Sequence, residues 1–211
     1  MAITYFQHRS NPYEIWTEDD ICALDKDTIE SVAKGIFDLE NEVWGHLGIT
    51  STMDLDRLLH SMLHKRSVIC GVAYEKPEDI YGPYLAYVMG YNLDESDPAV
   101  RMRIAGYEDL TGQSYEQLLE EIPSHKLYIM LSWTRGLDKK AIAENNRLSL
   151  GLLKYFKKKK IGLCGEFREA SSYPIIKRLE TRGDFVMKME HPIPNYLGDG
   201  ETYYIIVGYF K

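Results

Sequence analysis

The sequence predicts an α/β protein with a mixed central sheet and helices on both faces of that sheet. The main observation is the order of elements over residues 126–187, which reads strand, loop, long helix, short strand, second helix and strand. The first strand, at 126–133, is apolar nearly throughout and is expected to be buried on both faces. A second apolar run at 202–210 predicts a further strand, whose expected partner is 184–190.

Local patterns support each element in that order. Apolar residues on or near one face predict that the long helix follows the loop at 134–143 and runs through Lys158. The short strand is expected at 161–167. Residues 171–174 then open the second helix, which ends near Gly183.

The first half of the chain is predicted to hold two helices and three strands. Apolar residues at helical spacing predict the helices, and short apolar runs predict the strands. The first helix begins after Asp27 and is expected to stop at Gly45, because glycine commonly follows the last helical residue. The expected elements are a strand at 2–7, helices at 28–44 and 54–65, and strands at 67–74 and 84–91.

The loop at 134–143 is the main candidate for a ligand site. A strand that turns and opens a helix directs backbone N–H groups at one spot, and such a spot attracts phosphate. Lys139 and Lys140 add positive charge, whereas the carboxylate of Asp138 would repel an anion unless basic side chains offset it. The alternative is an ordinary helix start, in which Asp138 caps the first-turn N–H groups.

This order of elements resembles the core of the GNAT N-acetyltransferase superfamily. In that family the loop after the fourth strand carries Gln/Arg-x-x-Gly-x-Gly/Ala and holds the pyrophosphate of acetyl-CoA. Residues 138–143 align with this motif, and only the last position fits. Asp138 stands where Gln or Arg is expected, and Ala141 replaces the first glycine. The resemblance implies one GNAT-like domain over residues 1–211.

A later stretch, 172–185, looks like the family's Asn … Leu-Tyr … Gly-Phe segment. Ser172 takes the place of Asn, and Asp184 separates the Gly-Phe pair. Leu179 falls where the family often has its general-acid tyrosine. Residues 92–124, which are polar and hold a short expected helix at 115–121, would be an insertion in the family pattern.

The resemblance implies acetyl-CoA as the cofactor, bound at the strand end and the start of the long helix. The N–H groups near residues 132–134 are expected to stabilise an oxyanion. The candidate cofactor-binding residues are Ser132, Trp133, Thr134, Lys139, Lys140, Ala141, Ile142 and Ala143.

Tyr173 and Glu166 are the candidate acid and base. A tyrosine can protonate a departing thiolate, and a carboxylate can deprotonate an amine. The alternatives are that Tyr173 is a first-turn aromatic packed on the sheet and that Glu166 is a solvated strand residue.

Composition restricts the class of protein. With 45% hydrophobic and 27% charged residues, the chain has the balance of a soluble globular protein, and we expect it to be cytoplasmic. A net charge of −7 argues against nucleic acid and anionic membranes as partners. The three isolated cysteines favour buried thiols. His60 and His64 have helical metal-pair spacing, but Ser61 replaces the glutamate of HExxH, so no metal site is expected.

The predicted function is an acyl-CoA-dependent N-acyltransferase that acts on an amine of a small molecule or protein. The alternative is a non-catalytic GNAT-like module that binds a protein partner through a tyrosine-rich region. Tyrosine offers rigid contact area and a hydroxyl, although burial in an ordinary core is equally compatible with these residues. The tyrosines in question are Tyr81, Tyr84, Tyr87, Tyr91 and Tyr107.

Overall fold

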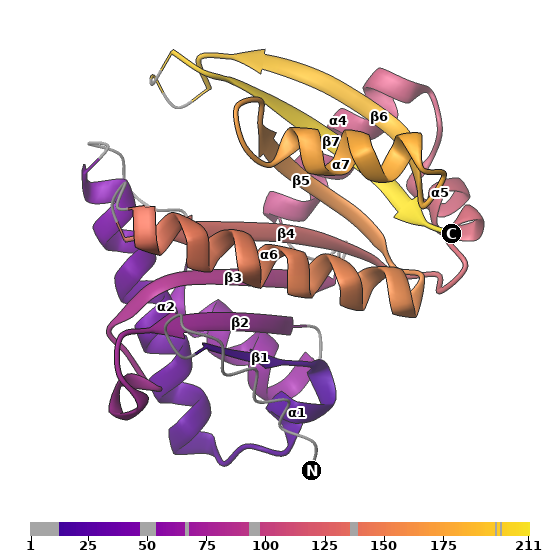
Figure 1. Cartoon of the computed structure of the whole chain (residues 1–211). Coiled ribbons are helices and arrows are strands. Elements are labelled where there is room, and N and C mark those ends of the chain that lie inside the picture. The colour runs from indigo at the N-terminus through magenta and orange to yellow at the C-terminus, as the bar shows by residue number, and fades with distance from the viewer. Residues whose placement is uncertain are drawn as a thin grey trace. The chain divides into compact units, whose positions relative to one another are not determined.

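A computed structural model of the chain describes residues 13–46, 54–65, 68–92, 98–135, 139–196, 198 and 200–211. Its strands form a seven-stranded mixed sheet in the order β1-β2-β3-β4-β5-β7-β6 (Figure 1). β4 and β5 are parallel, whereas β1/β2, β5/β7 and β6/β7 are antiparallel. The predicted α/β class with a mixed sheet is therefore confirmed. The strands are β1 Tyr13–Trp16, β2 Val68–Tyr74, β3 Tyr84–Asn92, β4 Leu127–Thr134, β5 Gly162–Arg168, β6 Phe185–Pro194 and β7 Thr202–Phe210.

The helices are distributed among these strands along the chain. A π-helical turn at Ser61–Lys65 continues α3, and a short 3-10 turn lies at Pro77–Asp79. None of the helices in the described ranges has the length and apolar character needed to cross a membrane. The α-helices are α1 Glu18–Cys22, α2 Lys26–His46, α3 Leu55–His60, α4 Pro98–Thr111, α5 Tyr115–Glu121, α6 Lys139–Lys159 and α7 Tyr173–Thr181.

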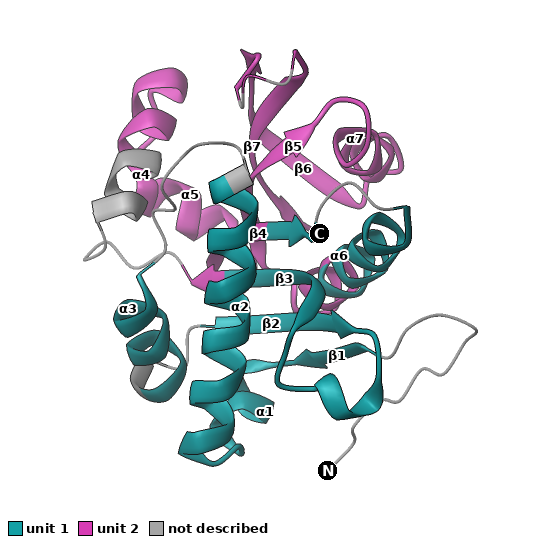
Figure 2. Ribbon diagram, turned by 90° about the vertical axis from the view of Figure 1, so that its left-hand side faces the viewer, with its two compact units in different colours: residues 1–90, 132–152 teal, residues 91–131, 153–211 magenta. Residues whose placement is uncertain are grey.

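The chain divides into two compact units, which are coloured separately in Figure 2. Unit 1 comprises residues 1–90 and 132–152, and unit 2 comprises residues 91–131 and 153–211. β4 and α6 each contribute to both units, because the boundaries fall within them.

In unit 1, α2 covers one face of the strands and α6 covers the other (Figures 1 and 2). Each of these two helices packs closely on the strands at a glycine. A Cβ on Gly35 of α2 would lie 2.6 Å from a ring carbon of Tyr84, and one on Gly151 of α6 would lie 2.5 Å from a methyl group of Ile15. The main chain of each helix thus reaches the side chains of the strand beneath it.

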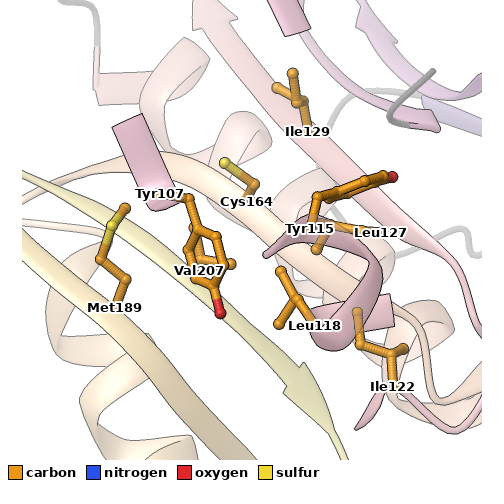
Figure 3. Close-up of a cluster of buried hydrophobic side chains, with 9 residues drawn as sticks. All are labelled: Tyr107, Tyr115, Leu118, Ile122, Leu127, Ile129, Cys164, Met189 and Val207. Carbon is orange, nitrogen blue, oxygen red and sulfur yellow. The ribbon is translucent and has the colours of Figure 1, made fainter. Parts of the chain in front are cut away.

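In unit 2, α4 and α5 cover one face of the strands and α7 covers the other (Figures 1 and 2). Side chains from α4 and α5 pack with β4, β5, β6 and β7 in one buried cluster (Figure 3). Ser114 caps α5 through a reciprocal bond pair with Gln117, which fixes where this short helix begins. The cluster comprises Tyr107, Tyr115, Leu118, Ile122, Leu127, Ile129, Cys164, Met189 and Val207.

The predicted helices and strands from residue 28 onward are present in the structure, with four corrections. Gly45 does not stop α2, which continues to His46. The second half of β4 is only half-buried, whereas Leu127 to Met130 are buried. β6 extends to Pro194 into the expected loop, because its proline positions are tolerated on an edge strand. The predicted strand at 2–7 lies outside the described residues.

The fourth correction is α4, which sequence reasoning missed inside the segment 92–124. Gly106 sits in the middle of this helix and suggested irregular chain. Pro98 at its first position was an available signal, since proline is favoured at the start of a helix. β1 and α1 were also missed, because four- and five-residue elements carry too little periodicity to be recognised.

Candidate functional site

The end of β4 contacts helices on both sides of unit 1. The Ser132 hydroxyl donates a hydrogen bond to Oδ1 of Asn145 on α6, at 2.7 Å. Trp133 faces the other way, and its ring meets Trp44 of α2 edge-on, with centroids 5.0 Å apart and planes at 66°. Strand alternation puts Thr134 on the same side as Ser132. The three strand-end candidates therefore lie at one place in the fold, with side chains directed at two different helices.

The first turn of α6 supplies the other cofactor-binding candidates. Lys139, Lys140, Ile142 and Ala143 are exposed, whereas Ala141 is buried with 1% of its surface exposed. The first turn contains no acidic residue, so nothing in the described helix start opposes the positive end of its dipole.

Two ion pairs involve basic residues near this helix start. Lys140 lies 3.7 Å from Glu75, and both side chains are about half exposed, so the pair is weak. Arg135 donates from Nε to Glu42 of α2 at 3.2 Å, and its backbone N–H donates to the carbonyl of Leu85. Arg135 is thus held toward α2. Asp138, the predicted cap, lies outside the described residues, as do positions 136 and 137.

Tyr173, the candidate acid, begins α7 in unit 2. Its ring stacks on Tyr204 of β7 with centroids 3.9 Å apart and planes at 12°. Its hydroxyl donates to the carboxylate of Glu190 on β6. Burial, and then the hydrogen bond and charge of Glu190, raise the pKa of Tyr173 to about 12. The phenol therefore holds its proton throughout the neutral range.

Lys177 follows Tyr173 by one helical turn and reaches the same carboxylate. Its Nζ lies 3.2 Å from Glu190 and 2.6 Å from Glu180. The bond to Glu180 is the largest cause that raises the pKa of Lys177. Desolvation raises the pKa of Glu190, but the hydrogen bonds from Tyr173 and Lys177 outweigh it, so the net shift is downward.

Sequence reasoning missed Glu190 and Lys177 as partners of Tyr173. The helical spacing of Tyr173 and Lys177 was visible, but nothing local indicated that a carboxylate on β6 would lie opposite them.

Glu166, the candidate base, lies on the opposite face of the same strands. It is half-buried on β5, and its register partner on β7 is Ile205. Strand alternation groups Glu166 with Cys164, which packs beneath α4 and α5, and separates Ile205 from Tyr204. Thus unit 2 does not bring Tyr173 and Glu166 together on one face.

Other candidates from the sequence have ordinary structural roles. Tyr84, Tyr87 and Tyr107 are buried, while Tyr91 is half-buried and Tyr81 is 48% exposed. Three of the five tyrosines are therefore core residues rather than parts of an open surface.

The histidine and cysteine candidates do not gather in a described cluster. No three His, Cys, Asp or Glu side chains in the described part of the chain are grouped to hold a metal ion. The side chain of His64 lies outside that part. Cys70 and Cys164 are buried free thiols, and burial raises the pKa of Cys70 to about 12.

Comparison with known proteins finds similarity at the level of structure. No protein-family model matches the chain, and no curated protein matches it either. The chain is similar to an agmatine N-acetyltransferase in its apo form, with a TM-score of 0.50 and 11% identity over 94% of this chain and 99% of that chain. It also matches NAA60 of Arabidopsis thaliana in complex with acetyl-CoA, with a TM-score of 0.41 and 13% identity over 93% and 97% of the two chains.

A third match is a GNAT-family protein from Desulfovibrio desulfuricans. Its TM-score is 0.39 and its identity 10%, over 94% of this chain and 98% of that chain. The likeness to the agmatine N-acetyltransferase concerns the fold, and the expected GNAT-like architecture is confirmed.

Proposed function

We propose that this protein is an acyl-CoA-dependent N-acyltransferase that uses acetyl-CoA and acts on an amine of a small molecule or protein. One observation carries the proposal. β4 leads into the long helix α6, whose first turn bears Lys139 and Lys140 and no acidic residue. Such a helix start offers backbone N–H groups and a positive dipole end to a diphosphate. The GNAT-like fold supports the same assignment.

The residues of the first turn of α6 suit a diphosphate. The first N–H groups of a helix have no partner within the helix and can bind an anion. The buried side chain of Ala141 points into the core, so its methyl group does not obstruct an anion approaching the exposed side of this turn. Lys139 and Lys140 are exposed and add positive charge.

Acetyl-CoA supplies an acyl group on a thioester. The amine nitrogen forms a bond to the acyl carbon, the carbon–sulfur bond breaks, and the thiolate takes up a proton. N–H groups near Ser132, Trp133 and Thr134 would stabilise the carbonyl oxygen as it becomes negative. Tyr173 and Glu166, the candidate acid and base, lie on opposite faces of the unit 2 strands, so they do not form one acid–base pair around the acceptor. The proton lost by the amine nitrogen and the proton gained by the thiolate therefore exchange with water.

An amine acceptor is supported by the chemistry named for the structural neighbours. Agmatine, a small amine, appears in the name of one of them. For this chain we propose only that the acceptor substrate is an amine.

Calorimetric titration with acetyl-CoA tests the proposal. We expect saturable binding by the unmodified protein. Lys139→Ala and Lys140→Ala should each weaken binding by roughly two- to fivefold, the size expected for an exposed ion pair. Lys154→Ala, an exposed change of the same charge farther along α6, is the control and should bind like the unmodified protein.

The absence of heat and of a thermal shift at high acetyl-CoA concentration would contradict the proposal. That result would favour the alternative, a non-catalytic GNAT-like binding module.

A further inference from the structure

Glu40 is a buried carboxylate in unit 1 that the proposed reaction does not use. It lies on α2 with 5% of its surface exposed. One of its oxygens accepts a hydrogen bond from Nε1 of Trp44, at 2.6 Å, and the other accepts from the hydroxyl of Tyr87 on β3. Glu40 therefore connects a strand of the sheet to an indole ring one turn away on its own helix.

Packing alone does not account for this carboxylate. Taking a carboxylate out of water costs free energy unless hydrogen bonds compensate, and an apolar side chain could fill the same space without that cost. A carboxylate at this position also orients its neighbours, because it accepts hydrogen bonds from Trp44 of α2 and Tyr87 of β3. The indole of Trp44 is thereby fixed in one orientation by a bond at its ring nitrogen.

Trp44 in turn contacts Trp133 near the end of β4. Its ring meets Trp133 edge-on, at a centroid distance of 5.0 Å. This is a favourable geometry for two aromatic rings and is specific to their relative tilt. Arg135, two residues after Trp133, forms an ion pair with Glu42 of the same helix. Figure 2 shows α2 running across β3 and the unit 1 end of β4.

We infer that Glu40 is a positioning residue for the acyl group, acting through Trp44 and Trp133 on the N–H groups at the end of β4. The inference rests on the proposed function, in which those groups contact the thioester carbonyl. A fixed indole contact keeps that short stretch of backbone in the geometry that an oxyanion requires. The diphosphate, held at α6, does not depend on this contact.

Comparing acetyl-CoA with CoA distinguishes a loss of positioning from a general loss of structure. Acetyl-CoA and CoA share the diphosphate, but only acetyl-CoA carries the carbonyl. Weakened positioning should therefore lower the affinity for acetyl-CoA and leave the affinity for CoA unchanged. A general structural defect should weaken both ligands alike.

The test uses Glu40→Gln and Trp44→Phe. The first keeps the shape of the side chain but replaces one accepting oxygen with a donor, and the second keeps an aromatic ring but lacks the N–H. Calorimetry with each ligand should show that the preference for acetyl-CoA over CoA falls by roughly two- to tenfold, the net contribution typical of one hydrogen bond. Lys34→Ala, an exposed change on α2, is the control and should keep the preference.

Circular dichroism supplies a readout that does not depend on ligand. Two indoles in contact couple their transitions, so Glu40→Gln, which keeps both indoles, should weaken the band that this coupling produces. Trp44→Phe removes one indole and defines the spectrum without the band. An unchanged preference in both variants, or an equal loss for both ligands, overturns the positioning role while leaving the proposed function in place. If the unmodified protein binds neither ligand, the proposed function itself fails and this inference fails with it.

Discussion

At the scale of single residues, the pair formed by Tyr173 and Glu190 has a consequence that can be measured. The carboxylate accepts the phenol's hydrogen bond and, by its charge, opposes formation of tyrosinate. Burial of the phenol, together with the hydrogen bond and charge of Glu190, raises the pKa of Tyr173 to about 12. The stabilisation associated with the phenol proton is present below the ordinary pKa of tyrosine and is lost as the pH rises through the folded value.

Glu190→Gln should lower the pKa of Tyr173 toward the ordinary value of tyrosine. The amide removes the negative charge and weakens the hydrogen bond, although the burial of the ring remains. Ultraviolet titration of tyrosinate measures the change, and the titration of a Tyr173→Phe variant identifies which part of the signal belongs to this residue. An unchanged alkaline transition in Glu190→Gln would show that Glu190 does not control this phenol.

At the scale of elements, two helical glycines should respond oppositely to alanine. A Cβ at Gly35 of α2 would lie 2.6 Å from the ring of Tyr84 and 3.1 Å from the backbone oxygen of Tyr81. A Cβ at Gly106 of α4 would meet nothing within 4 Å. Close packing on Tyr84 therefore requires a glycine at position 35 of α2, whereas no contact requires a glycine at position 106 of α4.

Gly106→Ala should stabilise the protein by up to about 1 kcal/mol, the difference in helix propensity between the two residues. Gly35→Ala gains the same propensity, but the crowding should destabilise by about 1–3 kcal/mol, so its net effect should be neutral to unfavourable. Chemical denaturation of the two variants compares them directly. A stabilised Gly35→Ala protein would mean that α2 does not pack on Tyr84 as described.

Elements were predictable where the sequence has a strong local period. The apolar run of β4, the spaced apolar residues of α6 and the terminal strand β7 are of this kind. α4 was missed because Gly106 interrupts its sequence and because its burial depends on contacts with β6 and α5. Local pattern cannot report such contacts, since they exist only after the chain has folded.

At the scale of the whole molecule, the GNAT-like fold could be recognised from element order, whereas the candidate site could be assembled from the sequence only in part. The loop between β4 and α6 could be proposed as a binding site because a strand, a loop and a helix are consecutive in sequence. The partners of Trp133 and Tyr173, namely Trp44 and Glu190, come from distant elements and were not predicted. The finding that Glu166 and Tyr173 lie on different faces of the strands also could not be predicted, because it depends on the register of β5 with β7.

In the proposed complex, acetyl-CoA places its diphosphate on the first turn of α6. Backbone amide NMR during an acetyl-CoA titration tests it most directly, because the proposed contacts are N–H groups. We predict that the largest shift changes fall on the amides of residues 139–143, with further changes at 132–134. If these amides stay unchanged while the ligand binds, or if the changes centre on the cluster beneath α4 and α5, the assignment of the site is wrong.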